Sequence, residues 1–407
     1  MTNDSAQTAV TILSGGLGAG KTTVLNHLLT SAEAREIAVL VNDMGALNVD
    51  ADLLRDQDGL SAAAGEVTEL SNGCICCELR DDLETAVIKL AREHSFEYLM
   101  VEPSGISEPM PVAKLFTGGS PAAARYSLSG VVTVIDTARF AEMYLDTDTS
   151  TSHVTQREKG DRPLTQVLIE QVESADVIIL NKTDLLDQQS IERLQELLTH
   201  LHPEASQIMT QYGAVKPDQV LNITQTQGKP AWTDAIESHT QREHNHEHRT
   251  DAINLNSSMY RRRRPFHPTR LTDVLTSLPS DIVRSKGYLW VASRNETQIL
   301  YNQAGRTATV KSVGPWIASL PEVDQTLYRN NRQDLSFEWD EKWGDRRTGI
   351  VFIGTQFDEN ALTTRLDAAL LTDEEFSDSS WSTSLKGEQF PTEPESRVVL
   401  SENCLSD

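Results

Sequence analysis

Gly15-Gly16-Leu17-Gly18-Ala19-Gly20-Lys21-Thr22-Thr23 is the stretch of sequence that decides the fold. It contains the pattern G-x-x-x-x-G-K-[ST], whose glycines let several backbone N–H groups point into one concavity. An apolar run at 10–13 precedes it, and a helix-like run at 24–29 follows it. The order strand, glycine loop, helix favours a polyphosphate at a helix N-terminus over an ordinary glycine-rich turn.

The residues of this loop have separate expected roles. Lys21 is expected to reach the β- and γ-phosphates, the Thr22 hydroxyl to ligate Mg²⁺, and Thr23 to contact the α-phosphate. The backbone of the loop completes the expected nucleotide-binding set: Gly15, Gly16, Gly18, Ala19 and Gly20.

Length and composition indicate a globular protein of more than one domain. At about 150 residues per domain, 407 residues predict two or three domains. The N-terminus has no basic segment leading into an apolar one, and no stretch approaches a membrane span, so we expect a cytoplasmic protein without membrane contact. The net charge of −24 argues against general binding to nucleic acid or to anionic membranes.

Strand-like and helix-like segments alternate in the first part of the chain. Apolar strand-like runs recur at 36–41, 98–101, 130–136, 177–180 and 207–210, and helix-like segments lie at 81–94, 164–172 and 191–200. Such alternation predicts an α/β fold with a mostly parallel sheet that helices cover on both faces. The run at 65–70 is compatible with a short strand or a hairpin.

Changes in composition divide the remaining chain. We expect a nucleotide-binding domain at 1–230, a His-containing linker at 231–258, a smaller α+β domain at 259–371 and an acidic tail at 372–407. Within the α+β domain, the pattern predicts strands at 288–292 and 350–353 and helices at 269–278 and 359–369. Few aliphatic residues and many Ser, Asp and Glu residues indicate that the tail is mobile, and the polar stretch at 146–162 indicates a loop.

Asn181-Lys182-Thr183-Asp184 directly follows a predicted strand, where a base-reading loop belongs. The Asp184 carboxylate can accept hydrogen bonds from both N1–H and the exocyclic amine of guanine, an arrangement that adenine lacks. Asn181 is expected to bond the far edge of the purine, and the stem of Lys182 to cover its face. Alone the motif fits an Asx-type turn, but downstream of a phosphate loop it predicts GTP.

Two further loops follow predicted strands. Glu102, in the pattern Glu-x-x-Gly, is expected to hold Mg²⁺ through water, and the N–H of Gly105 to sense the γ-phosphate. Asp43 follows the second strand, where a switch segment would lie, and either orients the attacking water, binds a metal, caps a helix or is a solvated loop carboxylate. We therefore assign Lys21, Asp43 and Glu102 to catalysis.

Cys74-x-Cys76-Cys77 places three thiols within one short segment. Thiolates are soft ligands that suit Zn²⁺ or Cu(I), and three of them leave a fourth position open, which suits transfer of a metal. The alternative is a group of buried, reduced cysteines. Four cysteines in 407 residues do not indicate a disulfide framework.

These motifs in this order resemble the CobW-type family of P-loop GTPases, the zinc-regulated GTPase metallochaperones and metalloprotein activators. The resemblance covers roughly residues 8 to 370 and extends to the later Arg-Pro-Phe-His-Pro and Gly-Asp-Arg-Arg stretches. It rests on the following segments: 15–23, Asn42-Asp43-x-Gly45, Asn72-Gly73-Cys74-x-Cys76-Cys77, Glu102-Pro103-Ser104-Gly105 and Asn181-Lys182-x-Asp184.

The resemblance implies GTP hydrolysis that is modulated by a metal, most often Zn²⁺ and in some members Co²⁺. It also implies delivery of that metal to a client apo-metalloprotein, with the metal on Cys74, Cys76 and Cys77. Many relatives have Asn-Glu-Phe-Gly, often followed by an acidic residue, where this chain has Asn42-Asp43-Met44-Gly45 and then Ala46. This difference weakens the case for a carboxylate-assisted metal site near the switch.

The sequence leaves several interpretations open. The leading hypothesis is a GTPase that loads metal onto a client; the second is a nucleotide-switched zinc buffer or sensor, and the third is a nucleotide-dependent factor that acts on RNA. The His239–His248 stretch is either a low-affinity metal collector or a solvated linker. The basic run Arg261–Arg264 favours internal ion pairs over nucleic acid in so acidic a chain. The client and the oligomeric state, including a homo-oligomer, stay open.

Overall fold

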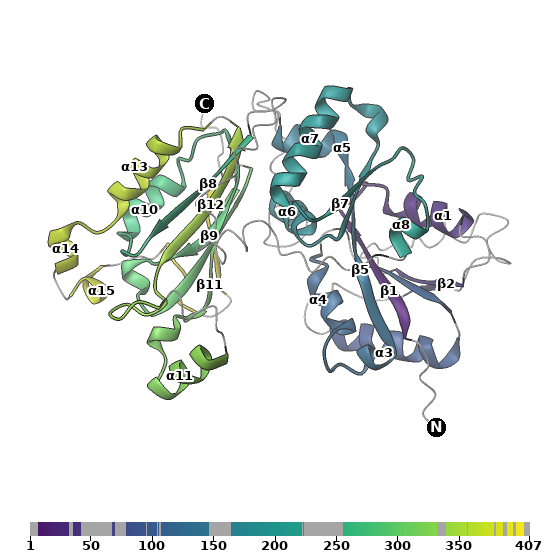
Figure 1. The fold of residues 1–407 in the computed structure, drawn as a ribbon, viewed down its shortest axis with the longest axis horizontal. Helices are drawn as coiled ribbons and strands as arrows, with labels where there is room; N and C mark the ends of the chain where they lie inside the picture. Colours follow the sequence, from purple (N-terminus) through teal and green to yellow (C-terminus); the bar gives the residue numbers. More distant parts are fainter. Residues whose placement is uncertain are drawn as a thin grey trace. The chain divides into compact units, whose positions relative to one another are not determined.

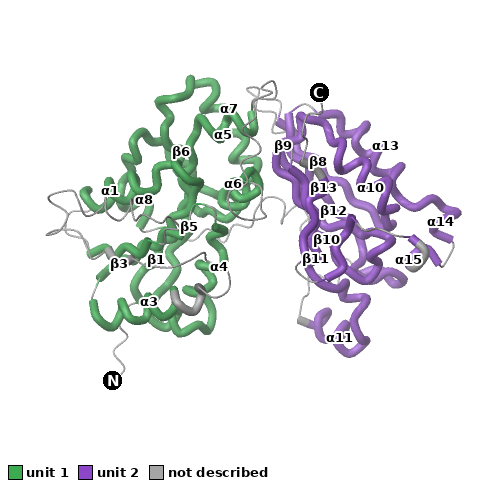
Figure 2. The backbone as a smooth tube through the Cα atoms, turned by 180° about the vertical axis from the view of Figure 1, so that it is seen from behind, with its two compact units in different colours: residues 1–146, 150–230 green, residues 147–149, 231–407 purple. Residues whose placement is uncertain are grey.

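The structure is a computed structural model that places most of the two predicted globular parts. It describes residues 7–31, 36–41, 67–69, 79–94, 96–103, 105, 107–145, 164–221, 223, 255–305, 307–331, 339–355, 357–377, 380–385, 389–393 and 396–402. The chain divides into two compact units, one of residues 1–146 and 150–230 and the other of 147–149 and 231–407 (Figure 2). Each unit is built around its own sheet.

The first unit contains a seven-stranded sheet in the order β3-β2-β4-β1-β5-β6-β7, and every neighbouring pair is parallel (Figure 1). Its strands are β1 Thr8–Gly15, β2 Ile37–Val41, β3 Val67–Glu69, β4 Tyr98–Glu102, β5 Tyr126–Asp136, β6 Val177–Asn181 and β7 Ser206–Met209. The predicted parallel sheet is confirmed. Within the predicted run at 65–70, the described residues 67–69 form a strand parallel to β2, so the strand alternative is confirmed for them.

Helices bury their apolar side chains on both faces of this sheet, as the alternating pattern predicts. The helices are α1 Lys21–Ser31, α3 Leu79–Glu93, α4 Met110–Ala113, α5 Thr137–Tyr144, α6 Leu164–Glu173, α7 Gln188–Leu201 and α8 Asp218–Leu221. One core cluster joins α1 and α8 to the sheet, and another joins α3 and α4 to it. Helix α5, which begins directly after β5, was not predicted.

The second unit contains a six-stranded antiparallel sheet in the order β13-β11-β10-β9-β12-β8. Its strands are β8 Leu255–Arg262, β9 Ile282–Leu289, β10 Thr297–Ala304, β11 Thr307–Pro315, β12 Thr348–Thr355 and β13 Arg397–Glu402. Helices α10 Pro268–Leu275 and α13 Glu359–Ala369 lie against one face of this sheet (Figure 1). Their apolar side chains are buried in one core cluster with those of the sheet. Helix α11 Glu322–Asn331 lies between β11 and β12 in sequence. The predicted α+β class is confirmed.

The acidic tail is partly folded, so the prediction of a mobile segment is wrong. Strand β13 pairs with β11, and short helices α14 Asp373–Ser377 and α15 Trp381–Ser384 precede it. Trp381 and Phe390 are buried, and Phe376 packs in the same aromatic cluster as Trp381. A few widely spaced aromatic residues anchor a segment whose average composition resembles that of a disordered chain.

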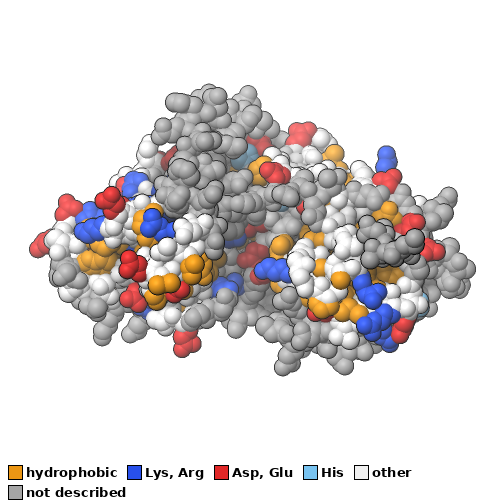
Figure 3. All heavy atoms as spheres, turned by 60° about the horizontal axis from the view of Figure 1, so that its bottom comes forward, with side chains coloured by type: hydrophobic (Ala, Val, Ile, Leu, Met, Phe, Trp, Pro, Cys, Tyr) orange, Lys and Arg blue, Asp and Glu red, His pale blue; other side chains and the backbone are white. Residues whose placement is uncertain are grey.

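Charged side chains of both signs are distributed over the described surface. On the face drawn in Figure 3, Lys and Arg side chains lie among Asp and Glu side chains rather than in one extended patch. Within the described ranges, no helix is both long enough and apolar enough to cross a membrane. The predicted loop at 146–162 and the His239–His248 stretch lie outside the described residues.

Candidate nucleotide site

The phosphate loop connects β1 to α1, as the glycine pattern predicts. Gly20 has a φ of +102°, and a Cβ on it would collide with the side-chain amide of Asn181. Helix α1 begins at Lys21, and the carbonyl of Gly20 accepts a hydrogen bond from Val24 N at 3.0 Å. The N-terminus of α1 therefore opens directly onto the loop, where its partial positive charge favours an anion.

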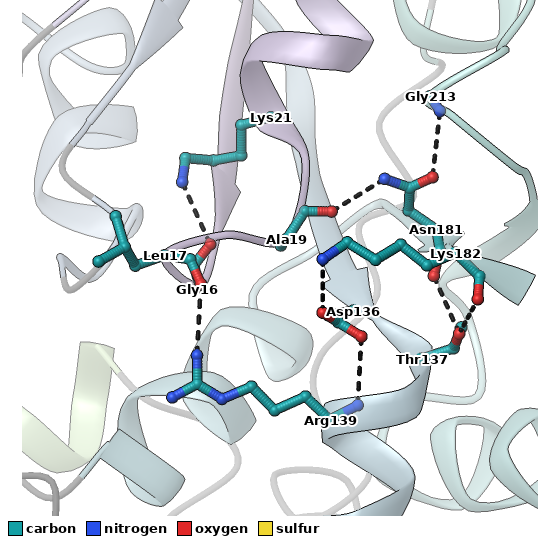
Figure 4. A network of polar contacts seen from close by, with 10 residues as sticks. All are labelled: Gly16, Leu17, Ala19, Lys21, Asp136, Thr137, Arg139, Asn181, Lys182 and Gly213. Atoms are coloured by element: carbon teal, nitrogen blue, oxygen red, sulfur yellow. Dashed lines mark hydrogen bonds and ion pairs between the residues drawn. The ribbon is translucent and has the colours of Figure 1, made fainter. Parts of the chain in front are cut away.

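Lys21 is buried and faces the end of the neighbouring strand. Its Nζ donates to the carbonyl oxygen of Gly16 at 3.3 Å (Figure 4). The same Nζ lies 3.7 Å from Oε1 of Glu102, the last residue of β4. A Cβ on Gly105 would lie 3.2 Å from that Nζ and 3.1 Å from the amide nitrogen of Leu17. Lys21, Glu102 and the Gly105 backbone thus come together beside the glycine loop, where the sequence places the γ-phosphate.

Asn181 connects the base-binding loop to the phosphate loop. Its Nδ2 donates to the carbonyl oxygen of Ala19 at 2.9 Å, and its Oδ1 accepts from the backbone N–H of Gly213 at 3.1 Å (Figure 4). The side chain is almost fully buried. The sequence predicts that Asn181 contacts the purine edge. It does not predict that the same amide connects its own loop to the phosphate loop and to the turn at Gly213.

Lys182 has a left-handed backbone conformation with φ of +61°, which is uncommon for a residue other than glycine. Two neighbours at the end of β5 stabilise it. The Thr137 hydroxyl donates to the carbonyl oxygens of Asn181 and Lys182 at 2.9 and 3.0 Å, and Asp136 Oδ2 accepts from Lys182 Nζ at 2.7 Å (Figure 4). The stem of Lys182 is therefore fixed before any ligand binds.

The end of β5 also contacts the phosphate loop. Asp136 caps α5 by accepting from the backbone N–H of Arg139 at 3.2 Å, and an Arg139 guanidinium N–H donates to the carbonyl oxygen of Leu17 at 3.4 Å. We did not predict Asp136, Thr137 or Arg139 as site residues. The signal was present, because Asp136 is the last residue of a buried strand and Thr137 directly follows it, near the positions that the predicted site residues occupy on their strands.

Some of the remaining predicted site residues are described by the structure, and others are not. Asp184 is exposed in a single turn of 3₁₀ helix, Thr183–Leu185, while Thr22 is half-buried and Thr23 exposed at the start of α1. Asp43, Cys74, Cys76 and Cys77 lie outside the described residues, and within the described part no group of three or more metal-ligating side chains comes together. Their predicted roles stay predictions.

Comparison with protein-family models gives two matches. Residues 9–209 match the CobW/HypB/UreG nucleotide-binding domain, and residues 255–370 match the C-terminal domain of the cobalamin synthesis protein CobW. The first match contains the phosphate loop, Glu102 and the Asn181–Asp184 loop. The second contains the antiparallel sheet except β13.

Curated relatives match across both units. Zinc-regulated GTPase metalloprotein activator 1 of Dictyostelium discoideum is 34% identical over 393 residues, which cover 90% of this chain and 80% of the relative. The zinc chaperone YjiA of Escherichia coli is 26% identical and covers 87% of this chain and 96% of its own length. The solved structure of Zn(II)-bound YjiA aligns with a TM-score of 0.37 and 20% identity, covering 90% of this chain and 99% of that one.

Proposed function

Because this chain belongs to the CobW/HypB/UreG family of nucleotide-binding proteins and is a GTPase of that family, we propose that it uses GTP to load zinc onto a client metalloprotein. The proposal rests mainly on one observation, that the phosphate loop and the Asn181–Asp184 loop meet at the carboxyl ends of the parallel strands. The Asn181 amide joins them through its hydrogen bond to the carbonyl oxygen of Ala19 at 2.9 Å. A nucleoside triphosphate is the ligand that needs both a phosphate cradle and a base-reading loop.

Lys21 supplies the positive charge for the terminal phosphates. Buried between Gly16 and Glu102, it neutralises charge that develops on the γ-phosphate oxygens during attack by water. Gly105 lies beside the same loop, and in this proposal its N–H responds to the presence of the γ-phosphate. Asp184 accepts from the guanine edge and thereby selects GTP over ATP.

The donors at this site fit a magnesium ion. The Thr22 hydroxyl and, through water, the Glu102 carboxylate would hold Mg²⁺, which neutralises charge on the β- and γ-phosphate oxygens. Hard oxygen donors at the N-terminus of α1 and the end of β4 match the preference of this ion. Asp43 is positioned in sequence to orient the attacking water.

The register of the sheet supports coupling between nucleotide and metal. Val41 at the end of β2 pairs with Glu69 of β3 on one side and with Glu102 of β4 on the other. At about 4.8 Å between strands, Glu69 and Glu102 lie about 10 Å apart across the sheet. Cys74, Cys76 and Cys77 follow soon after Glu69 in the sequence, and this short connection supports our proposal that the nucleotide and the thiols are coupled.

Zinc is the cargo in this proposal rather than a resident cofactor. Three thiolates bind a soft divalent ion and leave one position for a ligand from the client. A tight thiolate site releases its ion only when the ligands are rearranged. In this proposal, GTP hydrolysis changes the conformation at the ends of β2 and β4, and this change rearranges the thiolates. The names of the relatives, a zinc-regulated activator and a zinc chaperone, support zinc over Co²⁺.

The test is GTP hydrolysis by metal-stripped protein with Mg²⁺ present and Zn²⁺ titrated at buffered free concentrations. We expect Zn²⁺ to change the hydrolysis rate, and the variant with Cys74, Cys76 and Cys77 changed to Ser to lose the response. The matched control is Cys404→Ser, which removes the fourth cysteine of the chain and should leave the response intact. Binding of Zn²⁺ at the three thiols without any change of rate would favour the zinc buffer or sensor instead.

A further inference from the structure

The turn that follows β7 has an unusual residue at its tip. The backbone N–H of Ala214 donates to the carbonyl oxygen of Gln211 at 3.2 Å, and both central residues are left-handed, with φ of +52° at Tyr212 and +68° at Gly213. Positive φ at both positions defines a type I′ turn, in which Asn-Gly and Asp-Gly are the usual pairs. A bulky aromatic residue at the first position is strained there.

Hydrogen bonds fix this turn to the base-binding loop. Gly213 N donates to Asn181 Oδ1, and the carbonyl oxygen of Thr210 accepts from both the N–H and the hydroxyl of Thr183, at 3.3 and 3.1 Å. The Thr210 hydroxyl in turn donates to the carbonyl oxygen of Ala214 at 2.8 Å. The turn therefore has little freedom, and the strain at Tyr212 is maintained by its surroundings.

The same turn lies against the phosphate-loop end of α1. A Cβ on Gly213 would lie 3.0 Å from the carbonyl carbon of Thr23 and 2.8 Å from the backbone nitrogen of Val24. Tyr212 is thus flanked by the loop expected to read the base and by the residue expected to contact the α-phosphate. A nucleotide that spans these two loops has its base and sugar beside this turn.

The side chain of Tyr212 is not used by the fold. Its exposed fraction is 77%, the largest among the exposed apolar and aromatic residues of the described part, and no described residue provides its ring or hydroxyl with a partner. A strained backbone that presents an unpartnered aromatic ring beside a ligand site is the kind of outlier that indicates a ligand contact.

On the basis of the proposed GTP binding, we propose that the Tyr212 ring stacks on the guanine base and forms one wall of the base site, opposite the stem of Lys182. The Lys182 side chain is held by Asp136 at 2.7 Å, and the turn holds the backbone from which the Tyr212 ring extends. Asp184 then distinguishes guanine from adenine at the edge, while Tyr212 contributes affinity through the face. The contact is independent of the γ-phosphate, so it serves GTP and GDP equally.

The test measures equilibrium binding of GTP, GDP and inorganic tripolyphosphate to three variants of the full chain. Tyr212→Ala is expected to weaken GTP and GDP binding equally, by about tenfold to a hundredfold, with tripolyphosphate binding unchanged. Tyr212→Phe, which keeps the ring, is expected to bind within about twofold of the unmodified protein. Melting temperatures of all variants report on folding.

Tyr212→Gly separates stacking from backbone strain. Glycine relieves the positive φ, so this variant is expected to be at least as stable as Tyr212→Ala and yet to lose the same nucleotide affinity. Wild-type affinity in Tyr212→Ala, or affinity restored in Tyr212→Gly, would overturn the stacking role. Absence of GTP binding by the unmodified protein would instead overturn the proposed function, together with this inference.

Discussion

Basic side chains in the two units have different neighbours. The difference distinguishes a lysine that is positioned to bind a ligand from an arginine that stabilises the fold. In the parallel-sheet unit, buried Lys21 lies 3.3 Å from a carbonyl oxygen and 3.7 Å from a carboxylate oxygen. In the antiparallel-sheet unit, Arg262 contacts both carboxylate oxygens of Asp367, at 2.7 and 2.8 Å. One cation is held loosely in a glycine-lined concavity, while the other is fully engaged with a carboxylate of its own unit.

The position of a basic residue in the fold decides whether it binds a ligand or pairs with a carboxylate of its own unit. Lys21 follows glycines at the carboxyl end of a parallel strand, where a ligand can complete its coordination. Three residues of the basic run at 261–264 pair with carboxylates instead: Arg262 with Asp367, Arg263 with Asp340, and Arg264 with Asp373. The predicted internal ion pairs are confirmed there. We therefore expect substitutions in the first unit to change nucleotide binding and substitutions in the second to change stability.

The largest effect is expected from Lys21→Ala. Loss of the ammonium group that lies 3.3 Å from the Gly16 carbonyl oxygen and 3.7 Å from Glu102 removes charge stabilisation, so GTP hydrolysis should fall by about a hundredfold or more. The melting temperature should change little. The matched control is Lys89→Ala, an exposed lysine on α3, which should keep full activity in the same phosphate-release assay. Activity retained in Lys21→Ala would contradict the assigned phosphate site.

Asp367→Ala is the corresponding change in the second unit. Besides Arg262, it removes the acceptor of the buried Tyr260 hydroxyl at 2.9 Å, so unfolding free energy should fall by about 1–3 kcal/mol. GTP affinity should not change. Asp373→Ala breaks a pair whose carboxylate is 97% exposed and should change stability by less than about 1 kcal/mol. Urea denaturation of both variants tests this ranking, and equal losses would refute it.

Thr137→Val tests the support beneath the base-binding loop. It leaves the carbonyl oxygens of Asn181 and Lys182 without their described hydroxyl donor, so the left-handed conformation of Lys182 loses support and GTP affinity should fall about tenfold. Thr137→Ser keeps the hydroxyl and should bind almost normally. The comparison is made by nucleotide titration. If both variants bind equally well, Thr137 has no positioning role.

The smallest effect is a pH dependence confined to the second unit. Hydrogen bonds from Arg270 lower the pKa of Glu375 from 4.5 to about 2. Between these values the unfolded chain binds the extra proton, so the pair stabilises the fold above pH 4.5 and this contribution is lost as pH falls toward 2. The stability difference between the unmodified protein and Glu375→Gln should therefore shrink over that interval in urea titrations. A constant difference would show that Glu375 does not provide it.

Motifs that are contiguous in sequence were predictable, whereas contacts between distant segments were not. The glycine loop and the Asn181–Asp184 loop can each be recognised from a motif of a few contiguous residues. The parallel sheet can be predicted because apolar strand-like runs alternate with helix-like segments. The bond from Asn181 to Ala19 joins residues 162 positions apart, and the strained turn at Tyr212 is visible only in backbone angles. Neither leaves a local pattern in the sequence.

The folded tail was missed for a different physical reason. Phe376, Trp381 and Phe390 are separated by polar and acidic residues, so an average over the segment resembles a disordered chain. Phe376 and Trp381 pack in the aromatic cluster around Trp290, and Phe390 packs in the core between the antiparallel sheet and its helices, both built from residues distant in sequence. Composition alone does not reveal a segment that another part of the chain stabilises.

Nucleotide selectivity of an Asp184→Asn variant tests the central claim most directly. Binding of GTP, ATP and xanthosine triphosphate is titrated against the unmodified protein and the variant under one set of conditions. The account predicts that the unmodified protein prefers GTP and that the variant binds GTP about a hundredfold more weakly. The variant should bind xanthosine triphosphate more tightly than the unmodified protein does, because the edge of xanthine has an acceptor where guanine has an amine. Unchanged selectivity in the variant would contradict the claim that this loop reads a guanine base.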